Sequence, residues 1–154
     1  MKRTNTVDAK PTRGTASVTR SLADSLGVGG FQWIYFEVEP GETFSVCYHA
    51  HPDEEEIFYV LDGRATFETE DGEIYIESGE AVRFEPGEFQ HGFNETEEPV
   101  IALAFSAPRD REIGGVIECP ECGKRDHPRK ETSDDGNVTI IVCNACGSEV
   151  NRKD

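Results

Sequence analysis

Between residues 31 and 105, short apolar runs alternate with turn-forming residues about every ten positions. Glycines, prolines and Asp-Gly pairs separate the runs, which are FQWIYFEV (31–38), TFSVCYHAH (43–51), IFYVL (57–61), ATFETE (65–70), EIYIE (73–77), AVRFE (81–85), FQHGFN (89–94) and VIALAF (100–105). This pattern predicts a mainly β fold, an antiparallel sandwich or small barrel, and no convincing amphipathic helix interrupts it. The mouth of a small barrel is a natural site for a small ligand.

The second of these runs carries two histidines, His49 and His51, at alternate positions. Side chains two residues apart on a strand project from the same face, so both imidazoles point the same way. An acidic turn follows, and its last residue, Glu56, begins the next apolar run. Two histidines and one carboxylate form the ligand set of a mononuclear metal site. The alternative is a half-buried strand with two surface histidines.

The same residues resemble the first motif of the cupins, in which a glycine and a short strand precede His-x-His, a glutamate and a second glycine. The corresponding residues in this sequence are Gly41, His49, His51, Glu56 and Gly63. The spacer from Gly41 to His49 is two residues longer than is usual in the family. Two extra residues preserve the in–out alternation of a strand, so the histidines still share a face.

The segment GEAVRFEPGEFQHGFN (79–94) resembles the second cupin motif, with Gly79, Gly87 and Asn94 in register. That register puts Gln90 where the family has its third histidine, and His91 one residue late, on the opposite face. The resemblance therefore implies a barrel metal site of His49, His51 and Glu56 for Fe²⁺, Mn²⁺, Ni²⁺ or Zn²⁺. Gln90 is its weaker fourth group, because an amide oxygen is a poorer ligand than imidazole. The alternative is a barrel that no longer binds a metal.

Beyond the barrel, two CxxC pairs bring together four cysteines: Cys119, Cys122, Cys143 and Cys146. This spacing is typical of paired metal-binding knuckles, and four thiolates suit a structural, tetrahedral Zn²⁺. With the strand-like segment NVTIIVC between the pairs, the unit resembles a zinc ribbon. Tetrahedral iron is the chemical competitor, and a disulfide framework fits the spacing poorly.

These signals divide the chain into a disordered basic tail (1–20), a cupin barrel (21–110) and a zinc ribbon (111–154), with a linker at 107–115. The net charges of the three parts are +4, −18 and −2. A barrel this acidic stays soluble where salt screens repulsion, and it resembles cupins of halophilic archaea. The charge also disfavours nucleic-acid binding, except through the basic loop between the knuckles. We expect that loop to be solvated, with His127 a loop residue.

Alternation along the strands predicts which side chains line the barrel. Ser45, Cys47, His49 and His51 share one face, opposite Phe44, Val46 and Tyr48; Phe58 and Val60 accompany Glu56 inward, whereas Ile57, Tyr59 and Leu61 face outward. The outward residues need a cover, which the tail, a second sheet or a second subunit can supply; the cupin resemblance implies a homodimer. Cys47 is either a buried packing residue or an extra soft ligand.

The chain has no apolar run long enough for a membrane span and no signal-peptide core, so we expect a soluble, cytoplasmic protein. Three functions remain open. The first is a metal-dependent cupin enzyme such as an oxygenase or isomerase. The second is a non-catalytic module that binds a small molecule, and the third is an interaction protein whose ribbon contacts a protein or RNA. The fold alone does not choose among them.

Overall fold

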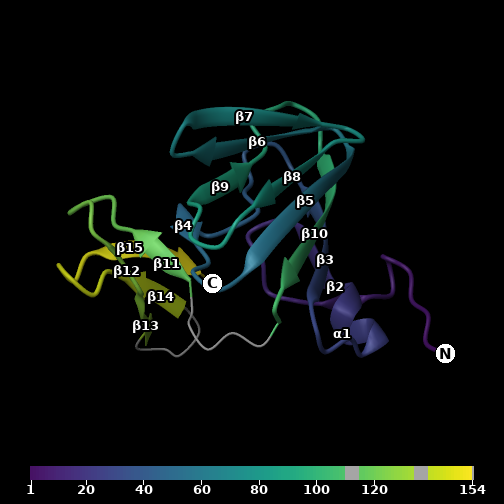
Figure 1. The fold of residues 1–154 in the computed structure, drawn as a ribbon, viewed down its shortest axis with the longest axis horizontal. Helices are drawn as coiled ribbons and strands as arrows, with labels where there is room; N and C mark the ends of the chain where they lie inside the picture. Colours follow the sequence, from purple (N-terminus) through teal and green to yellow (C-terminus); the bar gives the residue numbers. More distant parts are fainter. Residues whose placement is uncertain (110–114, 134–138, 154) are drawn as a thin grey trace.

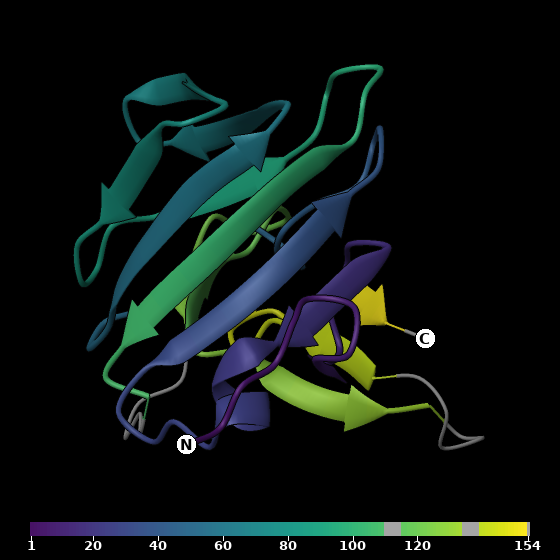
Figure 2. The same ribbon diagram turned by 90° about the vertical axis from the view of Figure 1, so that its right-hand side faces the viewer.

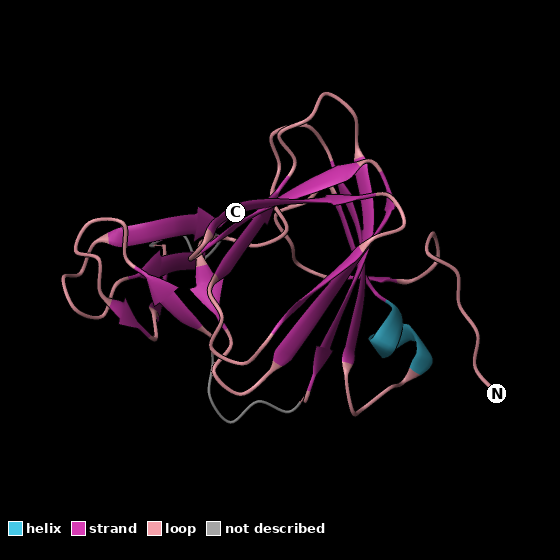
Figure 3. Ribbon diagram, turned by 45° about the horizontal axis from the view of Figure 1, so that its top comes forward, coloured by secondary structure: helices cyan, strands magenta, loops and turns pink. Residues whose placement is uncertain are grey.

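The computed structural model of the chain describes residues 1–109, 115–133 and 139–153. Within them, the fold consists of two six-stranded antiparallel sheets, most of whose strands form the barrel, and a third sheet of three strands beside it (Figures 1 and 3). The structure is a jelly roll, and it confirms the predicted mainly β, antiparallel barrel.

The first barrel sheet is formed around β10, which lies between β3 and β5 (Figure 2). Its strands, in spatial order, are β1 (Lys10–Pro11), β2 (Val18–Ser21), β3 (Gln32–Val38), β10 (Val100–Ala107), β5 (Glu55–Asp62) and β8 (Ala81–Phe84). Along β10, buried and half-buried residues alternate over the whole strand, as expected where one face packs on the core. On β5, Phe58 and Val60 are buried, whereas Tyr59 and Leu61 are exposed, which confirms the predicted alternation.

The second sheet carries most of the candidate site and continues into the C-terminal region. Its strands, in spatial order, are β12 (Arg125–Asp126), β11 (Val116–Glu118), β4 (His49–Ala50), β9 (Gln90–Phe93), β6 (Arg64–Thr69) and β7 (Gly72–Glu77). The third sheet consists of β13 (Arg129–Thr132), β14 (Thr139–Val142) and β15 (Glu149–Lys153). Residues 115–133 and 139–153 together form the C-terminal module.

Five phenylalanines form the centre of the barrel core: Phe36, Phe44, Phe58, Phe67 and Phe84. Their rings meet mostly edge-to-face or tilted, with centroids 4.8–6.3 Å apart. Gly92 is required here, because a Cβ at this position would lie only 2.5 Å from the Phe67 ring. The close contact lets β9 approach the core and sets the position of its neighbour Gln90.

The predicted regular strand over residues 43–51 is wrong for most of its length. Only His49 and Ala50 form a strand, and residues 44–48 follow a bent path. The Phe44 backbone N–H donates to the carbonyl of Gly92 (2.9 Å), and its ring is buried in the core. Phe44 was expected on the outward face, but burying its ring outweighs the regularity of a strand.

Residues 1–20, which the sequence predicted to be a disordered tail, contribute β1 and β2. A short helix follows them, α1 (Leu22–Leu26), capped by the Ser21 side chain, which accepts from the Asp24 N–H. Ala9, Leu22 and Tyr35 form a second buried cluster on the outer face of the first sheet. The segment is ordered because it covers apolar side chains that β3 and β10 would otherwise expose.

The C-terminal module packs directly against the barrel, next to β4 (Figure 1). Ile117 on β11 is the strand partner of His49 on β4. Arg125 pairs with Glu70 of the barrel (2.6 Å) and stacks on the Phe89 ring, 4.1 Å from its centroid. Five residues of the predicted linker 107–115, namely 110–114, lie outside the described residues.

Candidate metal centre

Three strands bring the predicted barrel residues together. His49 lies on β4, with His51 just beyond the end of that strand, and Glu56 lies on β5 in the opposite sheet. Gln90 is the direct partner of His49 across the β4–β9 pair. The two sheets of the barrel therefore converge on one group of side chains, as the sequence predicted.

The ligand atoms of His49, His51 and Glu56 all lie within 4.8 Å of one another. His49 Nε2 is 3.2 Å from His51 Nε2, and His51 Nε2 is 3.8 Å from Glu56 Oε2. Two donors that bind one ion at about 2.1 Å lie roughly 3.0–3.4 Å apart. The histidine pair falls in this range, and a small rotation of the Glu56 side chain covers the slightly longer second distance. The three residues thus fit a single divalent ion.

Hydrogen bonding prepares His49 for this role. Its Nδ1 lies 2.9 Å from the backbone carbonyl of Cys47, which can only accept, so Nδ1 carries the proton. In the neutral ring Nε2 then keeps its lone pair, directed toward His51 and Glu56. Metal-binding histidines commonly have their second nitrogen fixed in this way. The bend at residues 44–48 supplies this carbonyl, so the irregular backbone has a function at the site.

Glu54 is a site residue that the sequence analysis missed. Its carboxylate is 2% exposed and lies 3.7 Å from His51 Nδ1. It stands in an acidic turn of four carboxylates, and nothing in the sequence separates it from its half-buried neighbours. At this distance the negative charge of the carboxylate adds to the attraction of the site for a cation.

Gln90 is buried, and its Nε2 donates a 3.0 Å hydrogen bond to Glu56 Oε2. Its Oε1 is also buried and has no hydrogen-bond partner within the described residues. A buried amide oxygen left in this way is costly, and an ion or a water at the site would satisfy it. His91 belongs to the half-buried face of β9, where its ring lies beside Phe93, away from Gln90.

The four cysteines form a second cluster, in the C-terminal module. The Sγ atoms of Cys119 and Cys146 are 3.7 Å apart, as are those of Cys122 and Cys143. Two sulfurs at the corners of a tetrahedral zinc site with bonds of about 2.3 Å lie about 3.8 Å apart. A disulfide requires about 2.05 Å. The cluster therefore fits one tetrahedral ion and not a pair of disulfides.

The second knuckle is set up to supply thiolates. A hydrogen bond from the backbone N–H of Cys146 lowers the pKa of Cys143. Hydrogen bonds with Ser148 lower the pKa of Cys146 to about 6. Cys47, by contrast, lies apart from the cluster, and burial raises the pKa of its thiol to about 11. Among the described residues, neither group of possible metal ligands includes Cys47, which favours the packing interpretation.

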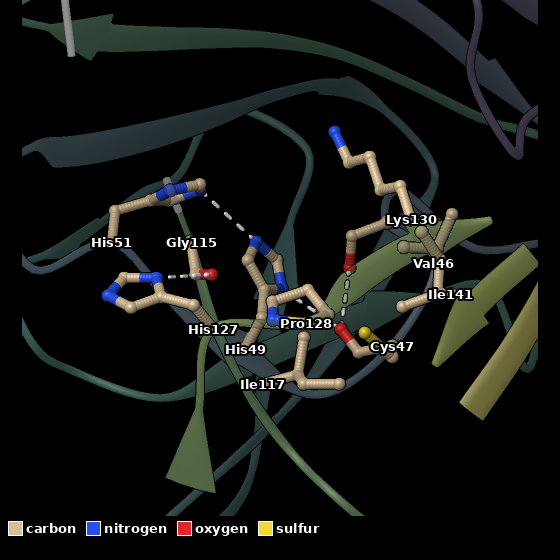
Figure 4. A pocket seen from close by; sticks show the side chains of 11 residues that line it. Val46, Cys47, His49, His51, Gly115, Ile117, His127, Pro128, Lys130 and Ile141 are labelled. Atoms are coloured by element: carbon tan, nitrogen blue, oxygen red, sulfur yellow. Dashed lines mark hydrogen bonds between the residues drawn. The ribbon is translucent and has the colours of Figure 1, made fainter. Parts of the chain in front are cut away.

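A cavity of about 400 Å³ opens between the histidine pair and the C-terminal module (Figure 4). The barrel contributes Ser45, Val46, Cys47, His49 and His51, and the module contributes Gly115, Ile117, His127, Pro128, Lys130 and Ile141. His127, expected to be a solvated loop residue, lies instead beside His51 in this wall. Spacing could not reveal this, because the position of the module on the barrel is set by packing.

Comparison with known proteins identifies the fold. Residues 34–106 match the family model described as the cupin domain. The barrel has the cupin fold. The match begins in β3 and ends in β10, so it includes the candidate metal centre and excludes the cysteine cluster.

Solved structures with a cupin barrel resemble the chain at low sequence identity. A sugar phosphate isomerase of the cupin superfamily from Silicibacter pomeroyi is 15% identical, with a TM-score of 0.62 over 97% of this chain and 92% of that one. A Cupin 2 conserved barrel domain protein from Salinispora arenicola is 20% identical, with a TM-score of 0.59 over 71% and 90%. Oxalate decarboxylase from Bacillus subtilis, which has Mn(II) centres, is 18% identical, with a TM-score of 0.57 over 73% and 30%.

No curated protein sequence matches the chain. Among the residues that the structure describes, no helix has the length and apolar character needed to cross a membrane.

Proposed function

We propose that the cupin barrel binds a divalent metal ion through His49, His51 and Glu56 and presents it to a small-molecule ligand. The observation that carries the proposal is the convergence of the three ligand atoms within 4.8 Å. The protonated Nδ1 of His49 supports it, because this ring then offers Nε2 to the ion. Gln90 Oε1, a buried amide oxygen with no hydrogen-bond partner among the described residues, is the further donor that we assign to the ion or to a water on it.

Such an ion, when bound, supplies Lewis acidity toward a ligand oxygen; Fe²⁺, Mn²⁺, Ni²⁺ and Zn²⁺ all suit a site of nitrogen and oxygen ligands. The protein's own residues hold the ligand in a cavity whose wall includes the apolar side chains of Val46, Ile117 and Ile141. The solved neighbours named as a sugar phosphate isomerase and an oxalate decarboxylase support a small, oxygen-rich ligand and, by analogy, a metal-dependent isomerase or decarboxylase.

The test is elemental analysis of the protein purified without added metal, for the wild type and for His49→Ala. We expect the wild type to carry a second equivalent of metal beyond the cysteine site and His49→Ala to lose it. His91→Ala is the matched control, because His91 belongs to the opposite face of β9, and it should keep both equivalents. A wild type with a single equivalent, or an unchanged His49→Ala, would refute the proposal.

A non-catalytic binding module is the second candidate, and the amide of Gln90 at the usual imidazole position favours it. A weaker metal site can still hold a ligand in the same cavity. The two candidates differ in turnover. Ligand-induced stabilisation that persists when the barrel metal is removed, with no product formed, would support binding alone.

For the C-terminal module we propose a structural zinc ribbon. The 3.7 Å spacing of the sulfur atoms in both cysteine pairs supports zinc, and the same geometry admits tetrahedral iron. Iron would colour the protein, whereas zinc would not, so an absorption spectrum together with elemental analysis separates the two. Four thiolates require a reducing compartment, which supports a cytoplasmic location.

The ribbon loop offers little support for binding of nucleic acid. Arg125 is occupied by Glu70 and Glu118, Arg129 pairs with Glu131, and Lys130 lines the cavity. We propose instead that the main macromolecular partner is a second copy of the chain. Phe31, Tyr59 and Leu61 are exposed large apolar side chains on or beside the first sheet. Leu61→Glu should shift the mass found by light scattering from dimer to monomer; a monomeric wild type would exclude the dimer.

A further inference from the structure

The C-terminal module reaches the candidate metal centre itself. A Cβ on Gly115 would lie 3.4 Å from the carbonyl of Ala50 and 3.6 Å from the His51 ring. The His127 ring lies next to Gly115, with its Nδ1 3.3 Å from the Gly115 carbonyl oxygen. This carbonyl can only accept, so His127 Nδ1 is the protonated nitrogen and Nε2 is left as an acceptor. The ribbon thus forms the second wall of the cavity that the barrel begins.

Lys130 is placed on the cavity side of the third sheet by strand register. Its partner across β13–β14 is Ile141, and the partner of Ile141 across β14–β15 is Asn151. Directly opposed residues share a face of the sheet. Ile141 lines the cavity, and the Asn151 side chain donates to the backbone carbonyl of Val46 on the barrel. Arg129 and Glu131, the neighbours of Lys130, alternate with it and pair with each other at 2.8 Å.

The described residues that line this cavity differ in composition from the acidic surface of the protein. The chain carries 31 acidic residues and a formal net charge of −16, with only four histidines. Among the described residues that line the cavity there is no carboxylate, whereas three of those four histidines and Lys130 are present. No described carboxylate forms an ion pair with Lys130. Although the carboxylates of Glu54 and Glu56 lie 3.7 and 3.8 Å from the His51 ring, Lys130 gives the module wall of the cavity a positive group suited to an anion.

We propose that the ribbon completes the ligand site and that Lys130 binds an oxyanion group of the ligand, a carboxylate or a phosphate. The proposal rests on the proposed function, since another oxygen of the same ligand is taken to face His49 and His51. Val46, Ile117 and Ile141 form the apolar wall against the carbon skeleton. At about 400 Å³, the cavity takes a small organic acid or a small phosphate ester.

The test is a titration of the full-length, metal-analysed protein with inorganic phosphate and, separately, with malonate at constant ionic strength. Dissociation constants come from amide chemical shifts, which also locate the site. We expect shifts in β4, β11 and β13 with at least one probe. Lys130→Gln should weaken that binding about five- to tenfold, because a charge-assisted hydrogen bond is lost.

Arg129→Gln is the matched control, because it removes the same charge one residue away on the other face of β13. It should change the affinity less than about twofold, since only screened long-range attraction is lost. Preference for phosphate or for malonate tells which oxyanion the site takes. Equal effects of Lys130→Gln and Arg129→Gln, shifts confined to other surfaces, or no binding of either probe would each overturn the proposal.

The outcome is separable from that of the barrel metal. If the protein carries a second metal equivalent but its affinity for the anion probes does not depend on Lys130, the anion site is contradicted and the metal proposal stands. Lys130-dependent binding to protein that contains only the cysteine-bound metal supports the anion site and contradicts the metal proposal. Zinc content and melting temperature of each variant confirm that it is folded before the affinities are compared.

Discussion

Glu54 is a buried side chain that lies directly behind the candidate site. We expect Glu54→Gln to weaken metal binding at the barrel about 10- to 100-fold, because the carboxylate behind His51 is replaced by a neutral amide of the same shape. Affinity is measured by competition with a chromophoric chelator, with the cysteine site already filled.

Glu55→Gln is the matched control for Glu54→Gln. Glu55 stands next to Glu54 in the same acidic turn, but it pairs with Arg83 on the outside of the barrel at 2.7 Å. Its substitution removes the same charge and should leave the affinity within about twofold, because exposed ion pairs contribute little. Equal losses in both variants would mean that the charge of the turn matters and the position of Glu54 does not.

Gly92 tests the packing that positions Gln90. Gly92→Ala should lower the free energy of unfolding by about 1–3 kcal/mol, because the added methyl group meets the Phe67 and Phe44 rings in a filled core. Urea denaturation followed by circular dichroism measures the loss. Gly29→Ala is the control, since nothing lies within 4 Å of a Cβ there, and it should be neutral or slightly stabilising. A neutral Gly92→Ala would mean that β9 can move away from the core.

At the scale of the strands, sequence alternation predicted the facing of side chains correctly on β5 but not around Phe44. Alternation along β5 predicted the inward Phe58 and the outward Tyr59, because one face of a regular strand is buried and the other is not. The same rule failed for Phe44, where the chain bends to bury a ring and, in doing so, offers the Cys47 carbonyl to His49. Side chains alternate between the two faces only where the backbone is paired as a strand. Nothing in the sequence of residues 43–48 indicates that this pairing is interrupted.

Contacts between distant segments were the other part that the sequence could not supply. The polar composition of residues 1–20 predicted disorder, yet Ala9 is buried over the outer face of β3. His127 and Lys130 looked like members of a basic loop, yet both line the cavity. In each case the decisive partner lies far along the chain, so local composition gave the wrong environment. The gathering of the four cysteines was predicted correctly, because the CxxC spacing is itself the signature of such a cluster.

The junction of β11 with β4 links the two candidate metal sites. Ile117 pairs with His49, and two residues later the chain reaches Cys119. We expect Cys122→Ser to lose the ribbon metal and, with it, the order of β11. Hydrogen exchange should then rise in β11, β12 and β4, whereas β10, paired on both sides within the barrel, should stay protected. Unchanged exchange in β4 would show that the barrel holds His49 without the ribbon.

The charge of the chain as a whole leads to the last prediction. With a formal net charge of −16, the folded barrel brings like charges close together, and their repulsion is stronger in the compact state than in the unfolded chain. Raising KCl from 0.1 to 1 M shortens the screening length from about 10 Å to about 3 Å. We therefore expect the melting temperature to rise by several degrees over this range, as calorimetry would detect. The local ion pairs of Arg83 and Arg125 oppose this trend, because salt weakens them as well. Their contribution is small at exposed positions, so repulsion should dominate. A melting temperature that falls with salt would show instead that attractive pairs control the stability, and the halophilic interpretation of the acidic surface would be wrong.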